Sequence, residues 1–250
     1  MLKRRMIVSL LWRKVGIVQS RGFSHTNVVG DPKVAIECFN AWDADEIILL
    51  NVERDDASLS QFLNLTEYVS YHCFLPLTVG GWVTNLDRAR NLVRHGADKI
   101  VINTEGFRRP AFIRAVSDVL GAQAVVASID VRRESHGSER VYLDRGRQAT
   151  DITPEKAAEI AAENGAGEIY ITSIDRDGGL QGYDTDLIRR VVAATDLPTI
   201  ASGGVGRWEQ LEEGLRAGAD AVSAANVFHF TEQSTRKAKT YLRGTDFPVR

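Results

Sequence analysis

Short apolar runs and helical patterns alternate eight times along this chain of 250 residues. The runs are MIVSLL (6–11), EIILLN (46–51), LPLTV (75–79), DKIVIN (98–103), AVVASID (124–130), EIYITSI (168–174), LPTIAS (197–202) and DAVSAAN (220–226). Because they are apolar without strict alternation, they are typical of parallel strands buried on both faces. Eight strand–helix units in a chain of this length predict a single (βα)8 TIM barrel spanning residues 1–250. The alternative, a doubly wound open sheet, seldom needs eight evenly spaced units.

Helix start signals lie between these runs. Asp31-Pro32 and Thr153-Pro154 place a capping residue before a proline at the first helical position, and Thr84-Asn85 offers a further cap. These signals divide the chain at the points that an alternating strand–helix fold requires.

The sequence also repeats itself after 122 residues. DEIILLNVERD from Asp45 matches GEIYITSIDRD from Gly167, and LPLTVGGWV from Leu75 matches LPTIASGGV from Leu197. HGADKIVIN from His95 likewise matches AGADAVSAA from Ala217. The repeat predicts two half-barrels, approximately residues 1–122 and 123–250, each with its own copy of whatever its loops bind.

Charge and cysteine content exclude several classes of protein. With 31 basic and 33 acidic side chains, the chain lacks the basic excess of a nucleic-acid binder. The two cysteines, Cys38 and Cys73, have no CxxC spacing, which suits a reducing cytoplasm. The apolar run near the start, Met6 to Trp12, is too short for a membrane span and lacks a cleavage site, so we expect a first strand there.

Small and polar residues cluster where the predicted strands end. In such barrels these ends form the functional face, and glycines allow backbone N–H groups to approach an anion closely. The residues expected to bind phosphate are Gly81, Asn103, Thr104, Asp177, Gly178, Gly203, Gly204, Ala225 and Asn226. Two repeat-related cradles predict a phosphorylated small molecule with a phosphate at each end. The alternative is that these glycines only make tight turns.

Three further stretches carry a resemblance to a known family. ITSIDRDGGLQGYD (171–184), IASGGVG (200–206) and ANVFHF (225–230) resemble the cyclase subunit of imidazole glycerol phosphate synthase, a barrel of histidine biosynthesis. The resemblance covers essentially the whole chain. It implies a glutaminase subunit at the N-terminal face of the barrel and ammonia that crosses the barrel to a bis-phosphate substrate. It implies no cofactor, and the histidines show no metal-ligand spacing.

The resemblance also implies two aspartates that act as general acid and base, at the ends of the first and fifth barrel strands. The second of these matches Asp130, whereas Leu11 stands at the position of the first. Aligning IVSLLWRK with VASIDVRR also sets Leu11 against Asp130. A leucine cannot transfer a proton, and general acid–base catalysis contributes roughly 10²–10⁴-fold. We therefore expect a severe loss of cyclisation activity.

Three more positions at the mouth depart from the family pattern. Gln19 replaces a lysine of the first loop, Asn51 replaces an aspartate, and Trp82 replaces a third glycine. Trp82 is expected to fill space near the first phosphate cradle and to resist a positive φ.

The opposite end of the barrel keeps the family pattern. In the family, charged residues at the strand starts form a ring that admits ammonia to the barrel. The matching residues here are Arg5, Glu46, Lys99 and Glu168. Lys99 lies four residues before Asn103, and this even spacing supports its inward placement. The alternative is that these are ordinary solvated strand ends.

Together these features favour an ammonia-conducting barrel that does not close an imidazole ring. The sequence resembles the branch of the family associated with glycosyl amidation, whose first strand likewise ends in leucines. That branch implies a sugar amidotransferase as a second partner and an acetamido sugar of a cell-surface polysaccharide as the ammonia acceptor. Two alternatives stay open: an authentic cyclase of histidine biosynthesis, and a non-catalytic scaffold that only activates a glutaminase.

Overall fold

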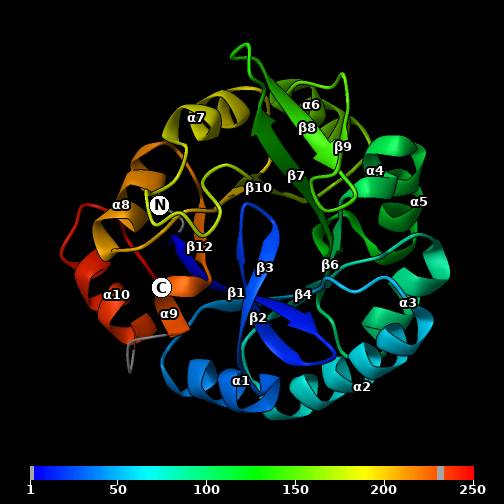
Figure 1. Ribbon diagram of the computed structural model, residues 1–250, viewed down its shortest axis with the longest axis horizontal. Helices are drawn as coiled ribbons and strands as arrows, with labels where there is room; N and C mark the ends of the chain where they lie inside the picture. The colour runs from blue at the N-terminus through cyan, green and yellow to red at the C-terminus, as the bar shows by residue number, and fades with distance from the viewer. Residues whose placement is uncertain (1–2, 230–233) are drawn as a thin grey trace.

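Eight parallel strands close into a barrel in the computed structural model, which describes residues 3–229 and 234–250 (Figure 1). The barrel strands are β1 (Arg5–Arg13), β4 (Glu46–Asn51), β5 (Leu77–Gly80), β6 (Lys99–Ile102), β7 (Val125–Arg133), β10 (Glu168–Ser173), β11 (Thr199–Ser202) and β12 (Ala221–Ala224). They pair in sequence order, and parallel pairing of β10 with β7 and of β12 with β1 closes the ring. The predicted (βα)8 TIM barrel is confirmed.

The strands follow the apolar runs, with differences at their ends. The first strand extends two residues beyond its apolar run, to Arg13, because Trp12 and Arg13 pair with the following antiparallel strand. Pro76 stands before β5 rather than inside it, since proline has no N–H to donate to the ladder.

Helices form the outer layer around the strands (Figure 1). They are α1 (Pro32–Ala41), α2 (Asp56–His72), α3 (Leu86–Arg94), α4 (Thr104–Arg108), α5 (Ala111–Leu120), the 3₁₀ turn η1 (Ala122–Ala124), α6 (Pro154–Glu163), α7 (Thr185–Ala193), α8 (Trp208–Arg216), α9 (Asn226–His229) and α10 (Ser234–Arg243). Asp31, Asn85 and Thr153 cap α1, α3 and α6 as expected, each accepting a backbone N–H in the first turn. None of the helices in the described ranges is long and apolar enough to cross a membrane.

Two antiparallel hairpins extend the barrel at its mouth. β2 (Gly16–Arg21) and β3 (Ser24–Gly30) follow β1, whereas β8 (Glu139–Leu143) and β9 (Gln148–Ala149) follow β7. Each predicted half-barrel therefore begins with a strand that continues into a hairpin. Viewed down the barrel, the β2–β3 hairpin lies across the centre of the ring, and the β8–β9 hairpin lies nearer its edge (Figure 1).

The interior of the barrel is filled in layers. Because strand residues alternate in direction, every second residue points to the axis. The lowest layer is charged and is described below with the functional site. Above it lies a mostly apolar layer, formed by Ile7, Ile48, Val101, Val126, Tyr170, Ile200 and Ala221. A second, larger core fills the space between the outer faces of the strands and the helices.

A buried ion pair ties the last helix to the barrel. Asp45, just before β4, accepts the Met6 backbone N–H at 2.7 Å with one carboxylate oxygen. Its other oxygen lies 2.7 Å from Nζ of Lys239, which extends from α10 and is almost completely buried. The pair links β1, β4 and α10, three segments that lie far apart in the sequence.

We predict that Lys239→Met destabilises the fold by about 3–5 kcal/mol, because it leaves the Asp45 carboxylate buried without a cation. Urea denaturation followed by circular dichroism measures this loss. Lys237→Met removes an exposed lysine from the same helix and is expected to change the free energy of unfolding by less than about 0.5 kcal/mol. Equal effects of the two substitutions would contradict the prediction.

Candidate active site

A cavity of about 280 Å³ opens at the C-terminal ends of the barrel strands. All the residues expected to bind phosphate line it, together with Asp130 and Leu11. The phosphate candidates come from both halves of the chain: Gly81, Asn103, Thr104, Asp177, Gly178, Gly203, Gly204, Ala225 and Asn226. The fold therefore brings the sequence-predicted mouth residues into a single cavity.

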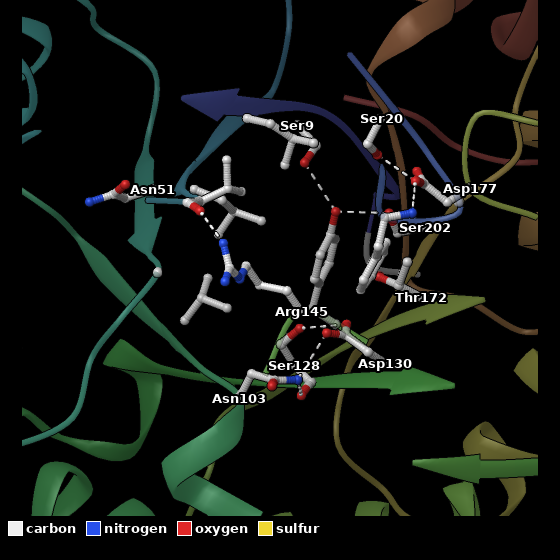
Figure 2. A pocket seen from close by; sticks show the side chains of 18 of the residues that line it. Ser9, Ser20, Asn51, Asn103, Ser128, Asp130, Arg145, Thr172, Asp177 and Ser202 are labelled. Atoms are coloured by element: carbon white, nitrogen blue, oxygen red, sulfur yellow. Dashed lines mark hydrogen bonds between the residues drawn. The ribbon is translucent and has the colours of Figure 1, made fainter. Parts of the chain in front are cut away.

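Asp130 lies near the end of β7 and is buried beneath this cavity. Its carboxylate accepts hydrogen bonds from Asn103 Nδ2 at 3.1 Å and from Ser128 Oγ at 3.3 Å (Figure 2). Burial raises the pKa of Asp130 to about 7; the Ser128 hydrogen bond opposes this rise, and the negative charge of Asp177 adds to it. A carboxyl that titrates near neutral pH can both give and accept a proton.

Leu11 reaches the same cavity from β1. It pairs with Leu50 of β4, and both side chains line the cavity. Its neighbours in the strand, Leu10 and Trp12, pack into the core outside the barrel. The strand register therefore directs Leu11, and neither neighbour, to the mouth, where it supplies no group that transfers a proton.

The cradle of the second half is built from glycine backbone. Gly203 and Gly204 have φ of +92° and +102°, values that side-chain-bearing residues rarely adopt. A Cβ on Gly204 would lie 2.3 Å from the Gly182 carbonyl oxygen, and one on Gly178 would lie 2.2 Å from that of Ser20. These positions require glycine, so the turns keep their backbone open to the cavity.

The cradle of the first half is different. Gly81 also has positive φ, and a Cβ there would lie 2.0 Å from the Asn51 carbonyl oxygen. Trp82 adopts φ of +57°, so the expectation that it would resist a positive φ is wrong. The Arg88 guanidinium lies 3.9 Å from the centre of its indole ring and donates to its carbonyl oxygen at 3.2 Å. These two contacts offset the backbone strain.

The side chains of Asn103 and Thr104 form hydrogen bonds within the protein. Asn103 donates to the Ser128 carbonyl at 2.8 Å as well as to Asp130. Thr104 Oγ1 donates to Asn103 Oδ1 and accepts the Asp144 backbone N–H, both at 3.0 Å. The turn between β8 and β9 is thus docked onto the first cradle.

Asp177 holds the β2–β3 hairpin at the mouth through hydrogen bonds. Its carboxylate accepts hydrogen bonds from Ser20 Oγ and from the Phe23 backbone N–H (Figure 2). Its backbone carbonyl accepts the Gly22 N–H at 3.0 Å. Asp177 therefore holds the β2–β3 turn as well as lining the cavity.

Four charged side chains form a closed cycle at the opposite end of the barrel. Arg5 pairs with Glu46, at 2.7 Å, and with Glu168. Lys99 Nζ lies 3.2 Å from Glu46 and 2.9 Å from Glu168. Thr78 donates to Glu46 at 2.6 Å. Burial disfavours the charged form of Arg5, but attraction to Glu168 and Glu46 prevails and raises its pKa. The predicted positions thus meet inside the barrel as a ring rather than as solvated strand ends.

Comparisons with known proteins agree with this geometry. The family model described as "Histidine biosynthesis protein" matches residues 12–234. The chain belongs to the histidine biosynthesis protein family.

Curated members of the histidine biosynthesis family are similar over their full length. Imidazole glycerol phosphate synthase subunit HisF of Dictyoglomus turgidum (strain DSM 6724 / Z-1310) is 38% identical over 250 residues, which cover 100% of this chain and 99% of the relative. Subunit HisF of Chlorobium limicola (strain DSM 245 / NBRC 103803 / 6330) is 38% identical, with both chains covered completely. A Vibrio vulnificus (strain YJ016) protein provisionally named subunit hisF2 is 37% identical over 100% of this chain and 92% of its own length.

This member of the histidine biosynthesis family carries an interior tyrosine that the sequence analysis missed. Tyr170 is buried on the barrel axis, between Glu168 and Thr172 along β10. Its hydroxyl bonds to Ser9 Oγ at 3.1 Å and to Ser202 Oγ at 2.8 Å (Figure 2), and burial raises its pKa. The even spacing from Glu168 was the available signal, since it places both side chains on the inner face.

Two arginines were also missed as part of the mouth. Arg54 follows β4, and Arg145 lies in the turn between β8 and β9; both line the cavity. Arg145 is half-buried, although it lies in a polar hairpin at the edge of the mouth. The fold brings together two segments that share no sequence pattern.

We predict a distinctive pH dependence for Asp130→Asn. Because the pKa of Asp130 is raised, the folded chain keeps a proton between about pH 4 and pH 7 that the unfolded chain releases. The free energy of unfolding of the native chain therefore falls across this window, by up to about 1.4 kcal/mol per pH unit, relative to that of Asp130→Asn.

Urea denaturation at several pH values measures the difference between the two proteins. Asp118→Asn removes an exposed carboxylate from α5 and serves as the matched control, with an expected change in the free energy of unfolding of less than about 0.5 kcal/mol. A constant difference for Asp130→Asn would show that the carboxyl titrates at its ordinary value.

Proposed function

We propose that this chain conducts ammonia from a glutaminase subunit at its N-terminal face to an acceptor at its mouth without cyclising a substrate. The acceptor we favour is an acetamido sugar of a cell-surface polysaccharide, amidated by a partner sugar amidotransferase in the cytoplasm. The observation that carries the proposal is a complete charged ring below combined with a cavity above that is lined by Leu11 and Asp130.

The ring supports an ammonia entrance because stability does not explain it. Barrel interiors are usually filled with branched apolar side chains, and a buried ion network is often no more stabilising than packed apolar residues. Here Arg5, Glu46, Lys99 and Glu168 replace such a layer. Lys99 is the most exposed of the four, at 22% of its side chain, so its rotation is the least costly way to open the cycle.

Polar groups continue the path above the ring. Tyr170 and the serines Ser9 and Ser202 place hydroxyl groups between the charged layer and Asp130. Ammonia both donates and accepts hydrogen bonds, so these hydroxyls suit a neutral molecule that crosses an otherwise apolar layer. Small movements of Tyr170 would be needed to let it pass.

The mouth supports ligand binding better than cyclisation. Asp130 keeps a pKa suited to proton transfer, but Leu11 offers no second acid or base for the pair that the family resemblance implies. The backbone cradle at Gly203 and Gly204 stays suited to a phosphate. We therefore assign the cavity to a phosphorylated small molecule.

The rim of the N-terminal face supports a protein partner. Tyr71 and Phe74, at the end of α2, leave 74% and 88% of their surface exposed. Phe74 and Asp98 border the same shallow surface depression. Exposed aromatic side chains beside charged residues are typical of interfaces.

A second candidate function is that of an authentic cyclase subunit. It is favoured by the full-length similarity to HisF subunits and by the retention of Asp130 in the family's position. A third, a scaffold that only activates a glutaminase, is favoured by the closed state of the ring.

A substitution in the ring separates conduction from scaffolding. Lys99→Met breaks the cycle at its most exposed member and leaves Glu46 and Glu168 with Arg5 alone. The assay reconstitutes the chain with a glutaminase and a sugar amidotransferase of the same organism and follows amidated sugar formed from glutamine or from ammonium.

We predict that Lys99→Met lowers glutamine-supported amidation about tenfold or more while glutaminase turnover and ammonium-supported amidation stay within about twofold, since only transfer through the ring is affected. Lys156→Met, which removes a paired surface lysine on α6, controls for loss of charge. If Lys99→Met behaves like this control, the barrel acts as a scaffold.

A further inference from the structure

Two arginine side chains meet on one side of the mouth without a full set of partners. Arg145 donates from Nη1 to the Val52 carbonyl at 3.3 Å, and Figure 2 shows it reaching into the pocket toward the end of β4. Arg54 comes from the loop after β4, and its Nε lies 3.8 Å from Asp144 Oδ1. Both line the cavity with Trp82.

Each guanidinium holds a buried N–H group that has no acceptor among the described residues: Nη1 of Arg54 and Nε of Arg145. A buried, unsatisfied donor on a charged group is costly, and most such donors in folded proteins have a partner. Two of them in one cavity indicate that an acceptor from outside the chain completes the arrangement.

The surrounding charge is also uncompensated. Burial lowers the pKa of Arg54, and repulsion from Arg145 lowers it further; Asp144 opposes the shift, and the more distant Arg147 adds to it. Glu105, the other carboxylate that lines the cavity near Thr104, is already paired with surface arginines. Two guanidinium groups against the Asp144 carboxylate leave one net positive charge here, which favours an anionic ligand.

The backbone holds this arrangement in place at some cost. Asp144 and Arg145 have φ of +47° and +59°, two consecutive left-handed residues with side chains. Such conformations cost on the order of 1 kcal/mol each and persist where the surroundings enforce them. The bond from the Asp144 N–H to Thr104 fixes the turn, so Arg145 points into the cavity and away from solvent.

We propose that Arg54 and Arg145 form a binding site for the phosphate dianion of a small molecule, opposite the backbone cradle at Gly203 and Gly204. Guanidinium groups offer paired N–H donors that match phosphate oxygens, and unsatisfied donors on two guanidinium groups suit the three free oxygens of a phosphate better than the two of a carboxylate. The first half of the barrel thus binds phosphate with side chains and the second half with backbone. A ligand with two unlike ends would be held in one orientation.

This site deepens the proposed function, because it rests on a phosphorylated ligand at the mouth, but its test is separate. The probe is inorganic phosphate, titrated into the ¹⁵N-labelled full chain and followed by NMR. The Nε–H signals of Arg54 and Arg145 report on the arginine site, and the amide signals of Gly203 and Gly204 report on the backbone cradle.

We expect saturable shifts of both arginine Nε–H signals. The double variant Arg54→Gln/Arg145→Gln replaces both charged groups with neutral polar ones. In this variant the glycine amides should still respond to phosphate. The affinity of the arginine site for phosphate should fall about tenfold or more. Arg147→Gln, an exposed arginine on the same hairpin, should leave both sets of shifts unchanged.

Silent arginine signals beside shifting glycine amides would overturn this site and leave the proposed function intact. Shifting arginine signals beside silent glycine amides would support this site and remove the backbone cradle from the proposed function. An equal response to acetate would overturn the assignment to phosphate. The native chain alone decides these outcomes, so the test does not depend on the folding of the double variant.

Discussion

Closure of eight parallel strands around one axis forces every second strand residue into a space with little room for water. Along β10 this places Glu168, Tyr170 and Thr172 one above another: a charged ring, a buried hydroxyl and the floor of the mouth. The charged ring, the layer that contains the Tyr170 hydroxyl and the cavity are therefore consecutive layers of one interior. Their order follows from the direction of the strands alone. The hairpins and helices contribute only residues that lie beyond the ends of the barrel strands.

Burial has three different consequences in this interior. At the bottom, four charges are neutralised by pairing with each other. Near the top, burial raises the pKa of Asp130 to about 7, and no cation pairs with it among the described residues. At the rim, Arg54 and Arg145 keep buried N–H groups that have no acceptor among the described residues. Pairing, protonation and an external ligand are the three ways in which a protein can accommodate a buried charge.

The sequence predicts what depends on periodicity and misses what depends on contacts between loops. The eight apolar runs and the 122-residue repeat were enough to predict the barrel, and the strand ends were enough to predict the lining at Gly203 and Asp130. Trp82 could not be predicted correctly, because Arg88, which stacks on it, acts through a tertiary contact. The role of Arg145 depends on the docking of a hairpin turn onto Thr104, for which the sequence has no pattern.

We propose that ammonia crosses this barrel but meets no cyclisation chemistry at Leu11. Ammonium-dependent cyclase turnover of the bis-phosphate substrate by the purified chain tests it most directly, with the HisF subunit of Chlorobium limicola as positive control. Leu11→Asp tests whether an acid at this position restores turnover, and Leu50→Asp places one on the neighbouring strand as a matched control. We predict no turnover by the native chain above background; turnover near that of the HisF subunit would contradict ammonia conduction without cyclisation.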